Sequence, residues 1–437
     1  MSTFNSVKYS LLNSEKSQFN LIFYPVVIIV IVIFLFYSLA DAGILTIPEI
    51  APLAHSNLNL NECPLRRWNK IRTDFIPNDD AHKFWQQRGV GRKDNFYHKS
   101  PSPFAAYAYK DHIAVTMTNE NSYGKQMFCR YFDCMQREIG DPFESSVFPE
   151  STVFCAHRVG AEFITLTMTI DKSDYEQPVR IKPRIEQEHF FTVCLASLYG
   201  DEPKFIQISD FVEYYKLQGA SFIHLYLRNV TKYDRRMLDS YARSGNIEVI
   251  QMHDNDWRPD FEWHNAQIND CHFRSKVFSK WTAFLDIDEK IEMLTPKYRR
   301  VIDYLKSITD PDISELMFRL RWVQKTADDP PKYINDEQMA ENLIYRKFNM
   351  TSTKVMSVSL QPKARYKNTR TIIVNSKIAL IRHYRNLKLR SFSPLALERI
   401  NSHGPYVPTR IAPWLDEGLT KNILGRMRFV YGEVCQV

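Results

Sequence analysis

The sequence predicts an α/β protein in which a nucleotide-binding mixed sheet, flanked by helices, follows a transmembrane helix, a stem and a small β-rich region. Three observations predict it. Residues 21–40 form an apolar run without charge, short strand-like runs fill 63–185, and strand and helix patterns alternate over 186–395. The 437 residues exceed the roughly 250 to 300 at which one core stops growing, so more than one folded unit is expected.

The apolar run at 21–40 is long enough to cross a bilayer core as a helix. Two lysines precede it, whereas no Lys or Arg follows it until Arg66, so residues 1–20 are expected to be cytoplasmic. A cleaved signal peptide is the alternative, because Ser38-Leu39-Ala40 fits a small-x-small cleavage site, but the run is longer than a usual signal core. We therefore expect a single-pass type II membrane protein.

The cysteines and sequons agree with exposure to the secretory pathway. All seven cysteines follow the apolar run: Cys63, Cys129, Cys134, Cys155, Cys194, Cys271 and Cys435. They lie in the compartment where disulfides persist, and none forms a Cys-x-x-Cys pair of the zinc type. The odd number leaves at least one thiol free or paired between chains, and the connectivity stays open. Asn229 and Asn349 each begin an Asn-x-Thr sequon for glycosylation.

Residues 41–62 are polar, contain two prolines and are expected to form the stem. The region 63–185 is expected to be a small antiparallel β region without a catalytic group, and 175–188 a linker. Its strand-like runs are Phe104–Met117, Gln126–Cys134, Val147–His157 and Phe163–Ile170. The neighbouring Cys155 and His157 are expected to be structural.

From residue 186 the pattern alternates. Strands are expected at Phe190–Leu198, Ser221–Leu227, Ile247–Met252 and from Trp281, separated by helices at Phe205–Leu217, Lys232–Arg243 and about His264–Lys280. Gly219 and Gly245 follow the first two helices, as is usual at helix ends. Crossovers of this length predict parallel strands of a nucleotide-binding half-sheet. The glycine-rich dinucleotide motif is absent from the sequence.

The fourth strand, Trp281–Glu289, ends in three carboxylates within four positions. Because successive strand side chains alternate, Asp286 and Asp288 are expected to point to one side, where they can share a hard divalent cation. Ligands of open α/β sheets bind beyond the carboxyl ends of the strands, where these residues are expected. We interpret them as the metal and diphosphate site of a sugar-nucleotide enzyme. The alternative is a solvated acidic turn, because Asp-x-Asp alone is a weak motif.

The rest of the domain is basic. A helix is expected at Pro296–Ser307 and strands at Ile313–Val323, Thr371–Val374 and Lys377–Ile381, while residues 396–437 are expected to be a C-terminal extension. Between residues 342 and 390 there are twelve Lys or Arg and no Asp or Glu, which favours a polyanionic ligand. The membrane topology argues against nucleic acid. His383 follows the last strand and is a candidate for completing the metal site.

Several separated motifs together resemble glycosyltransferase family 92. They are Cys194-Leu-Ala-Ser-Leu-Tyr-Gly-Asp-Glu-Pro-Lys, Gln218-Gly-Ala-Ser-Phe-Ile-His-Leu-Tyr, Asp270-Cys-His-Phe-Arg, Lys280-Trp-Thr-Ala-Phe-Leu-Asp-Ile-Asp-Glu, and the stretch Lys367–Tyr384. The resemblance covers about residues 188–390. It implies a single-pass Golgi-type membrane protein with a GT-A fold and a lumenal catalytic part. It also implies manganese-dependent, inverting transfer of galactose from UDP-galactose to a glycan acceptor on a glycoprotein or glycolipid.

The resemblance also implies roles for individual residues. Asp286 and Asp288 would bind the metal, Mn²⁺ or another divalent cation, and the donor diphosphate, with His383 as a further ligand. The uridine would lie near Tyr199 and Glu202. Arg274 is a candidate for donor binding or for a structural ion pair. The sequence departs from the family's pattern in two places: Lys290 stands where an apolar or aromatic residue usually follows, and the loop 325–331 lacks an expected glycine.

An inverting reaction needs a carboxylate to accept the proton of the acceptor hydroxyl. Asp328 and Asp329 are the candidates, and Glu315 and Asp312 remain open. A haloacid-dehalogenase-type phosphatase is a rival interpretation, although Glu289 and Lys290 stand where such sites carry a small hydroxylated residue. A lumenal lectin or scaffold that has lost activity is the non-enzymatic alternative.

Overall fold

The computed structural model describes residues 63–77, 101–119, 122, 124–171, 177–253, 263–325, 329–343, 348–351, 370–385, 398, 406–408 and 410–432. The chain divides into two units, residues 1–62 and 63–437, and the first lies outside the described residues. Within the described ranges no helix has the length and apolar character needed to cross a bilayer. The membrane helix expected at 21–40, the cytoplasmic tail and the stem fall in the undescribed unit.

The β-rich region forms one seven-stranded sheet in the order β4-β3-β6-β7-β1-β2-β5. All neighbouring strands are antiparallel except β1 and β7, which are parallel. The strands are β1 (Pro103–Ala108), β2 (Ile113–Met117), β3 (Gln126–Phe132), β4 (Glu138–Ser146), β5 (Thr152–Cys155), β6 (Phe163–Thr167) and β7 (Val179–Pro183). The run expected at 104–117 is thus a hairpin of two strands, and β7 occupies the stretch expected to be a linker.

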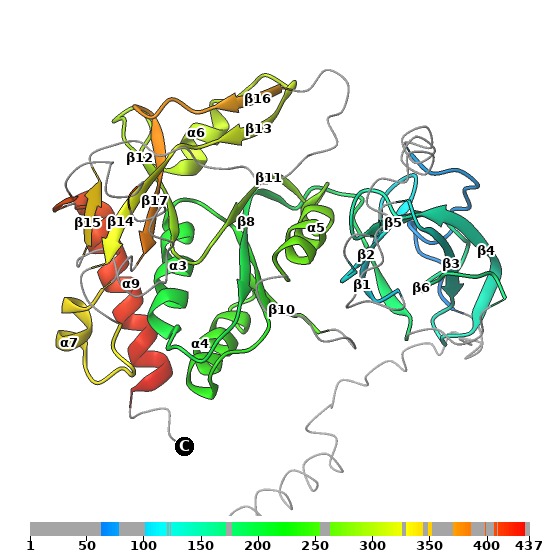
Figure 1. Cartoon of the computed structure of the whole chain (residues 1–437), viewed down its shortest axis with the longest axis horizontal. Helices are drawn as coiled ribbons and strands as arrows, with labels where there is room; N and C mark the ends of the chain where they lie inside the picture. The colour runs from blue at the N-terminus through cyan, green and yellow to red at the C-terminus, as the bar shows by residue number, and fades with distance from the viewer. Residues whose placement is uncertain are drawn as a thin grey trace, which may run out of the picture. The chain divides into compact units, whose positions relative to one another are not determined.

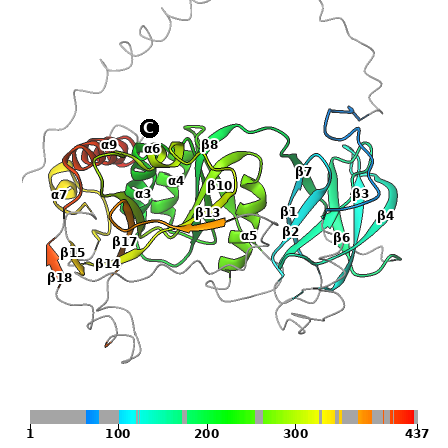
Figure 2. The same cartoon turned by 90° about the horizontal axis from the view of Figure 1, so that it is seen from above.

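The second part begins with a four-stranded parallel sheet in the order β10-β9-β8-β11. Its elements are β8 (His189–Leu198), α3 (Phe205–Leu217), β9 (Phe222–Leu227), α4 (Lys232–Ala242), β10 (Ile247–Gln251), α5 (Trp263–Ser275) and β11 (Ser279–Leu285). The alternation predicted from the sequence is confirmed. Because β11 lies on the other side of β8 from β9, right-handed crossovers place α5 on the opposite face from α3 and α4, as Figure 2 shows.

After β11 the chain enters a second sheet, which has the order β12-β17-β14-β15-β18. The strands β13 and β16 pair separately. Its strands and the neighbouring elements are β12 (Glu289–Met293), α6 (Val301–Lys306), β13 (Ile313–Met317), β14 (Leu320–Lys325), α7 (Asp336–Glu341), β15 (Phe348–Thr351), β16 (Arg370–Ile373), β17 (Ala379–Arg385) and β18 (Tyr406–Pro408). The prediction of a single strand at Ile313–Val323 is wrong. The chain leaves β13 after Met317 and enters another sheet at Leu320, because the two halves pair with different partners.

The helix α9 (Pro413–Tyr431) completes the core of this part. Its buried side chains recur at helical spacing and form one apolar stripe: Leu415, Leu419, Ile423, Met427 and Val430. They belong to the same cluster as the side chains of α3 and the parallel sheet, and Figure 1 shows α9 beside α3. The core of the predicted 186–395 domain therefore includes residues well beyond 395, in the stretch expected to be an extension.

Three disulfides lie in the described residues. Cys63–Cys134 and Cys129–Cys155 are within the β-rich region, and Cys194–Cys271 joins β8 to α5. Cys435 lies outside the described residues. The disulfides predicted from the position of the cysteines are present, and the connectivity that the sequence left open is now assigned for six of them.

Candidate functional site

The acidic stretch forms a tight turn between the two sheets. The strand β11 ends at Leu285, and the backbone N–H of Glu289 donates to the Asp286 carbonyl at 3.1 Å. The prediction that the strand runs to Glu289 is therefore wrong for residues 286–288, which form the turn. Strand alternation does not decide where their side chains point. The turn lies at the carboxyl edge of the parallel sheet, which is the usual place for a ligand in open α/β folds.

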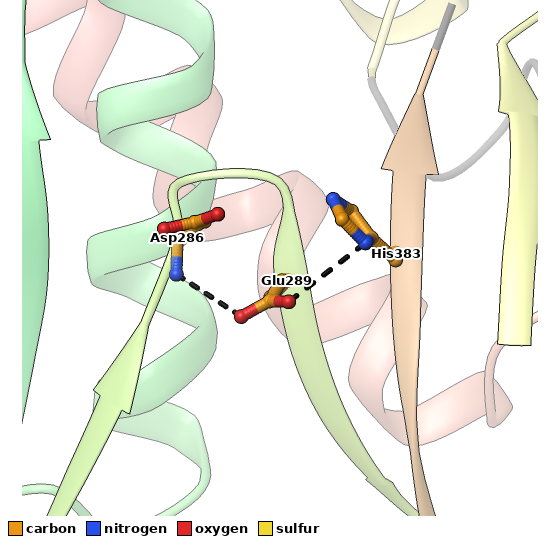
Figure 3. A group of neighbouring side chains, drawn as sticks. All are labelled: Asp286, Glu289 and His383. Carbon is orange, nitrogen blue, oxygen red and sulfur yellow. Dashed lines mark hydrogen bonds and ion pairs between the residues drawn. The ribbon is translucent and has the colours of Figure 1, made fainter. Parts of the chain in front are cut away.

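The turn brings together three side chains, one from the turn itself, one from β12 and one from β17. Asp286, Glu289 and His383 each offer a ligand atom within 4.8 Å of the others (Figure 3). Glu289 and His383 are opposite each other in the antiparallel pair of β12 and β17, with Glu289 Oε1 3.8 Å from His383 Nδ1. The Asp286 N–H donates to Glu289 Oε2 at 3.1 Å. Two carboxylates and an imidazole at this spacing can hold a divalent cation.

Asp288 and Trp322 complete the surroundings of the histidine. The Asp288 carboxylate lies 3.3 Å from His383 Nε2, and its carbonyl accepts from the Tyr384 N–H at 2.8 Å. The Trp322 indole stacks on the imidazole with ring centroids 4.8 Å apart and planes inclined by 15°. His383 is buried. Its ring is consequently held in one plane, with one nitrogen toward Asp288 and the other toward Glu289.

The electrostatics of the turn also favour a cation. Burial raises the pKa of Glu289 to about 7, and the negative charge of Asp286 acts in the same direction, while His383 opposes it. A carboxylate that is costly to ionise in this way gains from a positive charge beside it. Because the site is half-buried rather than fully exposed, this effect is screened less than at a free surface.

The structure thus brings together the predicted Asp286, Asp288 and His383, and it adds Glu289. Their role as metal ligands stays a prediction. In the sequence, Glu289 is the last carboxylate of the acidic stretch, and no local pattern assigns it a role. The missing information was the register between β12 and β17, which joins residues 289 and 383.

The residues predicted to be near the uridine follow the neighbouring strand. β8 pairs with β11, and Tyr199 comes directly after β8 with 42% of its surface exposed. Glu202 is exposed and makes an ion pair with Lys204, with Glu202 Oε2 2.8 Å from Lys204 Nζ. Both lie at the same edge of the sheet as the acidic turn, and their donor-binding role stays a prediction.

Arg274 lies in a buried network on α5. It contacts Asp270 Oδ2 at 2.9 Å and Glu248 Oε1 at 2.8 Å, and only 3% of its side chain is exposed. Asp270 also accepts from Tyr107 at 2.7 Å and Thr116 at 2.8 Å, both of the β-rich region. These contacts are those of a structural ion pair, the second of the two roles considered for Arg274.

Of the two candidate bases, Asp328 lies outside the described residues. Asp329 accepts from the Gln207 side chain of α3, with Nε2 and Oδ2 2.6 Å apart. It is not in the group formed by the turn and His383. The remaining candidates are near the two-stranded sheet, where the Glu315 carboxylate accepts from Thr371 and the Asp312 carbonyl accepts from the Arg370 N–H.

The two sequons lie in different settings. Asn229 is exposed in the loop after β9, where its side-chain oxygen accepts from the Gly200 N–H at 3.2 Å. Asn349 is in β15, whose backbone pairs with β14 and β18. Glycosylation of either asparagine stays a prediction.

Residues 189–419 match glycosyltransferase family 92. The chain belongs to this family. A curated relative, the beta-1,4-galactosyltransferase galt-1 of Caenorhabditis elegans, is 23% identical over 215 residues, which are 46% of this chain and 50% of that protein. The chain thus spans about half the length of the curated relative it matches. The family resemblance deduced from the separated motifs is confirmed, and the match includes most of the first two turns of α9.

Among solved structures, an intact type IV self-sufficient cytochrome P450 monooxygenase is 12% identical with a TM-score of 0.14, covering 51% of this chain and 30% of that one.

Proposed function

We propose that this family 92 glycosyltransferase is metal-dependent and transfers galactose from UDP-galactose, with inversion, to a glycan acceptor on a glycoprotein or glycolipid. The observation that carries the proposal is the convergence of Asp286, Glu289 and His383 at the carboxyl edge of the parallel sheet. The order of the four strands and the site beyond their carboxyl ends support a GT-A type of nucleotide-sugar domain. Galactose as the donor sugar is supported by the name of the distant nematode relative.

The donor set fits Mn²⁺ or another divalent cation, because two carboxylates and one imidazole supply hard oxygen ligands and one borderline nitrogen. Asp286, Glu289 and His383 would hold the cation, and Asp288 lies beside the histidine. When bound, the cation would neutralise the charge that develops on the leaving diphosphate.

The remaining roles belong to the chain's own side chains. Trp322 holds the plane of His383 by stacking, which keeps the imidazole ready for a ligand. Tyr199 and Glu202 would contact the uridine from the end of the neighbouring strand. Asp328 or Asp329 would accept the proton of the acceptor hydroxyl as it attacks the anomeric carbon from the face opposite the diphosphate.

The proposed location is a Golgi or other secretory-pathway membrane, with one N-terminal helix at 21–40 and the catalytic part in the lumen. The apolar run, the positive charge before it and the two sequons support this topology. Three disulfides in the described residues also fit an oxidising compartment.

The test is an assay of the fragment 41–437 for UDP release from UDP-galactose and other UDP-sugars, with a glycan array as the acceptor. We expect release that needs Mn²⁺ and disappears with EDTA. Asp286→Asn and Glu289→Gln should each lower the rate by at least about 100-fold, because each removes a charge next to the leaving group.

The matched control is Asp303→Asn, an acid that pairs with Arg300 on the surface of α6 and should leave the rate unchanged. Full activity in EDTA would refute the metal dependence. Release of inorganic phosphate from phosphomonoesters, without sugar transfer, would favour the phosphatase interpretation. Glycan binding without any turnover would favour the inactive lectin.

A further inference from the structure

The strand that carries Glu289 has one free edge in its sheet. β12 is the end strand of the order β12-β17-β14-β15-β18, so only its inner edge pairs with another strand. The helix α3 lies on the outer side, where the backbone groups of Ile291 are buried and the carbonyl of Glu289 is partly buried. Buried backbone N–H and C=O groups need partners, so something other than a strand has to supply them.

Two neighbouring tyrosines of α3 supply these partners. The Tyr215 hydroxyl donates to the Glu289 carbonyl at 3.0 Å and accepts from the Ile291 N–H at 3.1 Å. The Tyr214 hydroxyl donates to the Ile291 carbonyl at 3.0 Å. Both tyrosines are fully buried. The Tyr215 hydroxyl thus bridges the two backbone groups on either side of Lys290, and the Tyr214 hydroxyl binds the other backbone group of Ile291.

Lys290 adds a second tie between β12 and α3. Its ammonium group pairs with the Asp210 carboxylate, and both side chains are almost fully buried. Since successive strand residues point to opposite faces, the Glu289 side chain faces away from this pair, toward Asp286 and His383. The departure from the family pattern at Lys290 is therefore accounted for by a buried ion pair.

We propose that Tyr215 is a positioning residue for the divalent-cation site, an inference that rests on the metal dependence proposed above. The inner edge of β12 is fixed by β17, where Glu289 is opposite His383. Tyr215 fixes the outer edge at the same residue, since its hydroxyl holds the carbonyl of Glu289 itself. The Glu289 carboxylate is thereby kept within 4.8 Å of the other ligand atoms. Without the hydroxyl, the strand end can shift to find other partners, and the carboxylate shifts with it.

The test compares Tyr215→Phe with Tyr214→Phe in the fragment 41–437. Each change removes one buried hydroxyl from the same helix. Tyr215→Phe loses two bonds to the strand and Tyr214→Phe loses one, so both should lower the melting temperature, Tyr215→Phe by the larger amount. Only Tyr215→Phe loses the bond to the Glu289 carbonyl. We expect its dissociation constant for Mn²⁺, measured by electron paramagnetic resonance titration, to rise about 10-fold, as is usual for groups that orient a metal ligand. That of Tyr214→Phe should stay within about 2-fold of the wild type.

Equal dissociation constants for the two variants would overturn the inference. The proposed metal dependence is tested separately by the wild type and by Asp286→Asn. If the wild type binds no Mn²⁺, both proposals are refuted, whereas binding that Asp286→Asn abolishes and Tyr215→Phe leaves unchanged refutes this inference alone. If either phenylalanine variant is too unstable for titration, the rise in melting temperature at saturating Mn²⁺ replaces it, and the smaller rise is expected for Tyr215→Phe.

Discussion

At the scale of single residues, Glu289 has two separate sets of contacts. Its backbone carbonyl and N–H belong to the turn and to the edge of β12, where Asp286 and Tyr215 bind them. Its carboxylate faces Asp286 and His383. A residue fixed on the backbone side can present a charged side chain in a half-buried place without losing its position, which is what a metal ligand requires.

The pKa of Glu289 leads to a prediction about pH. Burial and the nearby Asp286 carboxylate raise it to about 7, compared with about 4.3 in an unfolded chain. The metal-free protein therefore gains stability from this group at low pH, and it loses that gain as the pH rises from about 4 to above 7. A cation needs the ionised carboxylate, so we expect Mn²⁺ to raise the melting temperature more at pH 8 than at pH 6.

Thermal unfolding with and without Mn²⁺ at the two pH values measures this effect. Glu289→Gln cannot titrate, and it should reduce the difference between the two pH values. An equal rise in melting temperature at pH 6 and pH 8 in the wild type would contradict the prediction.

The sequence allowed part of the site to be predicted at this scale. Asp286, Asp288 and His383 could be found because an acidic stretch after one apolar strand and a histidine near the end of another are local patterns. The parts played by Glu289, Trp322 and Tyr215 could not, since each depends on a partner that is about 60 to 100 positions away in the chain. A local sequence pattern does not show which of these distant residues lie next to each other.

At the scale of elements, the ends of helices lead to a second prediction. Gly219 follows α3 with a φ of +96°, and an added Cβ would lie 2.4 Å from Ile302 Cγ2. We expect Gly219→Ala to lower the free energy of unfolding by about 2 kcal/mol or more, because both the backbone and the packing are strained. Urea denaturation of the fragment 41–437 measures it.

Two other glycines separate the cost of backbone strain from the cost of the contact with Ile302. Gly245 has a φ of +79° with no atom within 4 Å of an added Cβ, so Gly245→Ala should show the backbone cost alone, about 1 kcal/mol. Gly425 lies inside α9 with open space around it, and Gly425→Ala should raise stability by about 0.5 to 1 kcal/mol. If Gly219→Ala were no worse than Gly245→Ala, the contact with Ile302 would not matter.

Helices and strands were predictable where the pattern was local. The alternation over residues 189–285 predicted β8 to β11 and the helices between them, because each element has its own period and the first two helices have glycine stops at Gly219 and Gly245. The second sheet was less predictable. β13 and β14 follow each other closely, but they pair with β16 and β17 in different sheets, and only those distant partners divide the run.

At the scale of the whole molecule, Asp270 joins the β-rich region to the family 92 domain. Its carboxylate accepts from Tyr107 and Thr116 of the first and from Tyr226 and Arg274 of the second. All five side chains are buried from solvent. The two parts of residues 63–437 are thus connected by a common polar network.

We expect Asp270→Ala to lower the free energy of unfolding by about 3 to 5 kcal/mol, because it leaves Arg274 as a buried cation with one partner fewer. The matched control is Asp239→Ala, which breaks an exposed pair with Arg235 at the same spacing on a helix and should cost less than 1 kcal/mol. Denaturation followed by fluorescence compares the two, and equal costs would show that the network contributes no more than a surface pair.

The late position of α9 has a consequence for synthesis. The apolar face of α3 is complete once residue 217 has left the ribosome, but the helix that covers it begins only at residue 413. At usual rates of translation the nascent chain waits about 10 to 40 s with this face uncovered. Chaperones that protect such surfaces should accompany it during that interval, and a stop codon that removes the residues from 413 onward should be nearly as damaging as one in the middle of the domain.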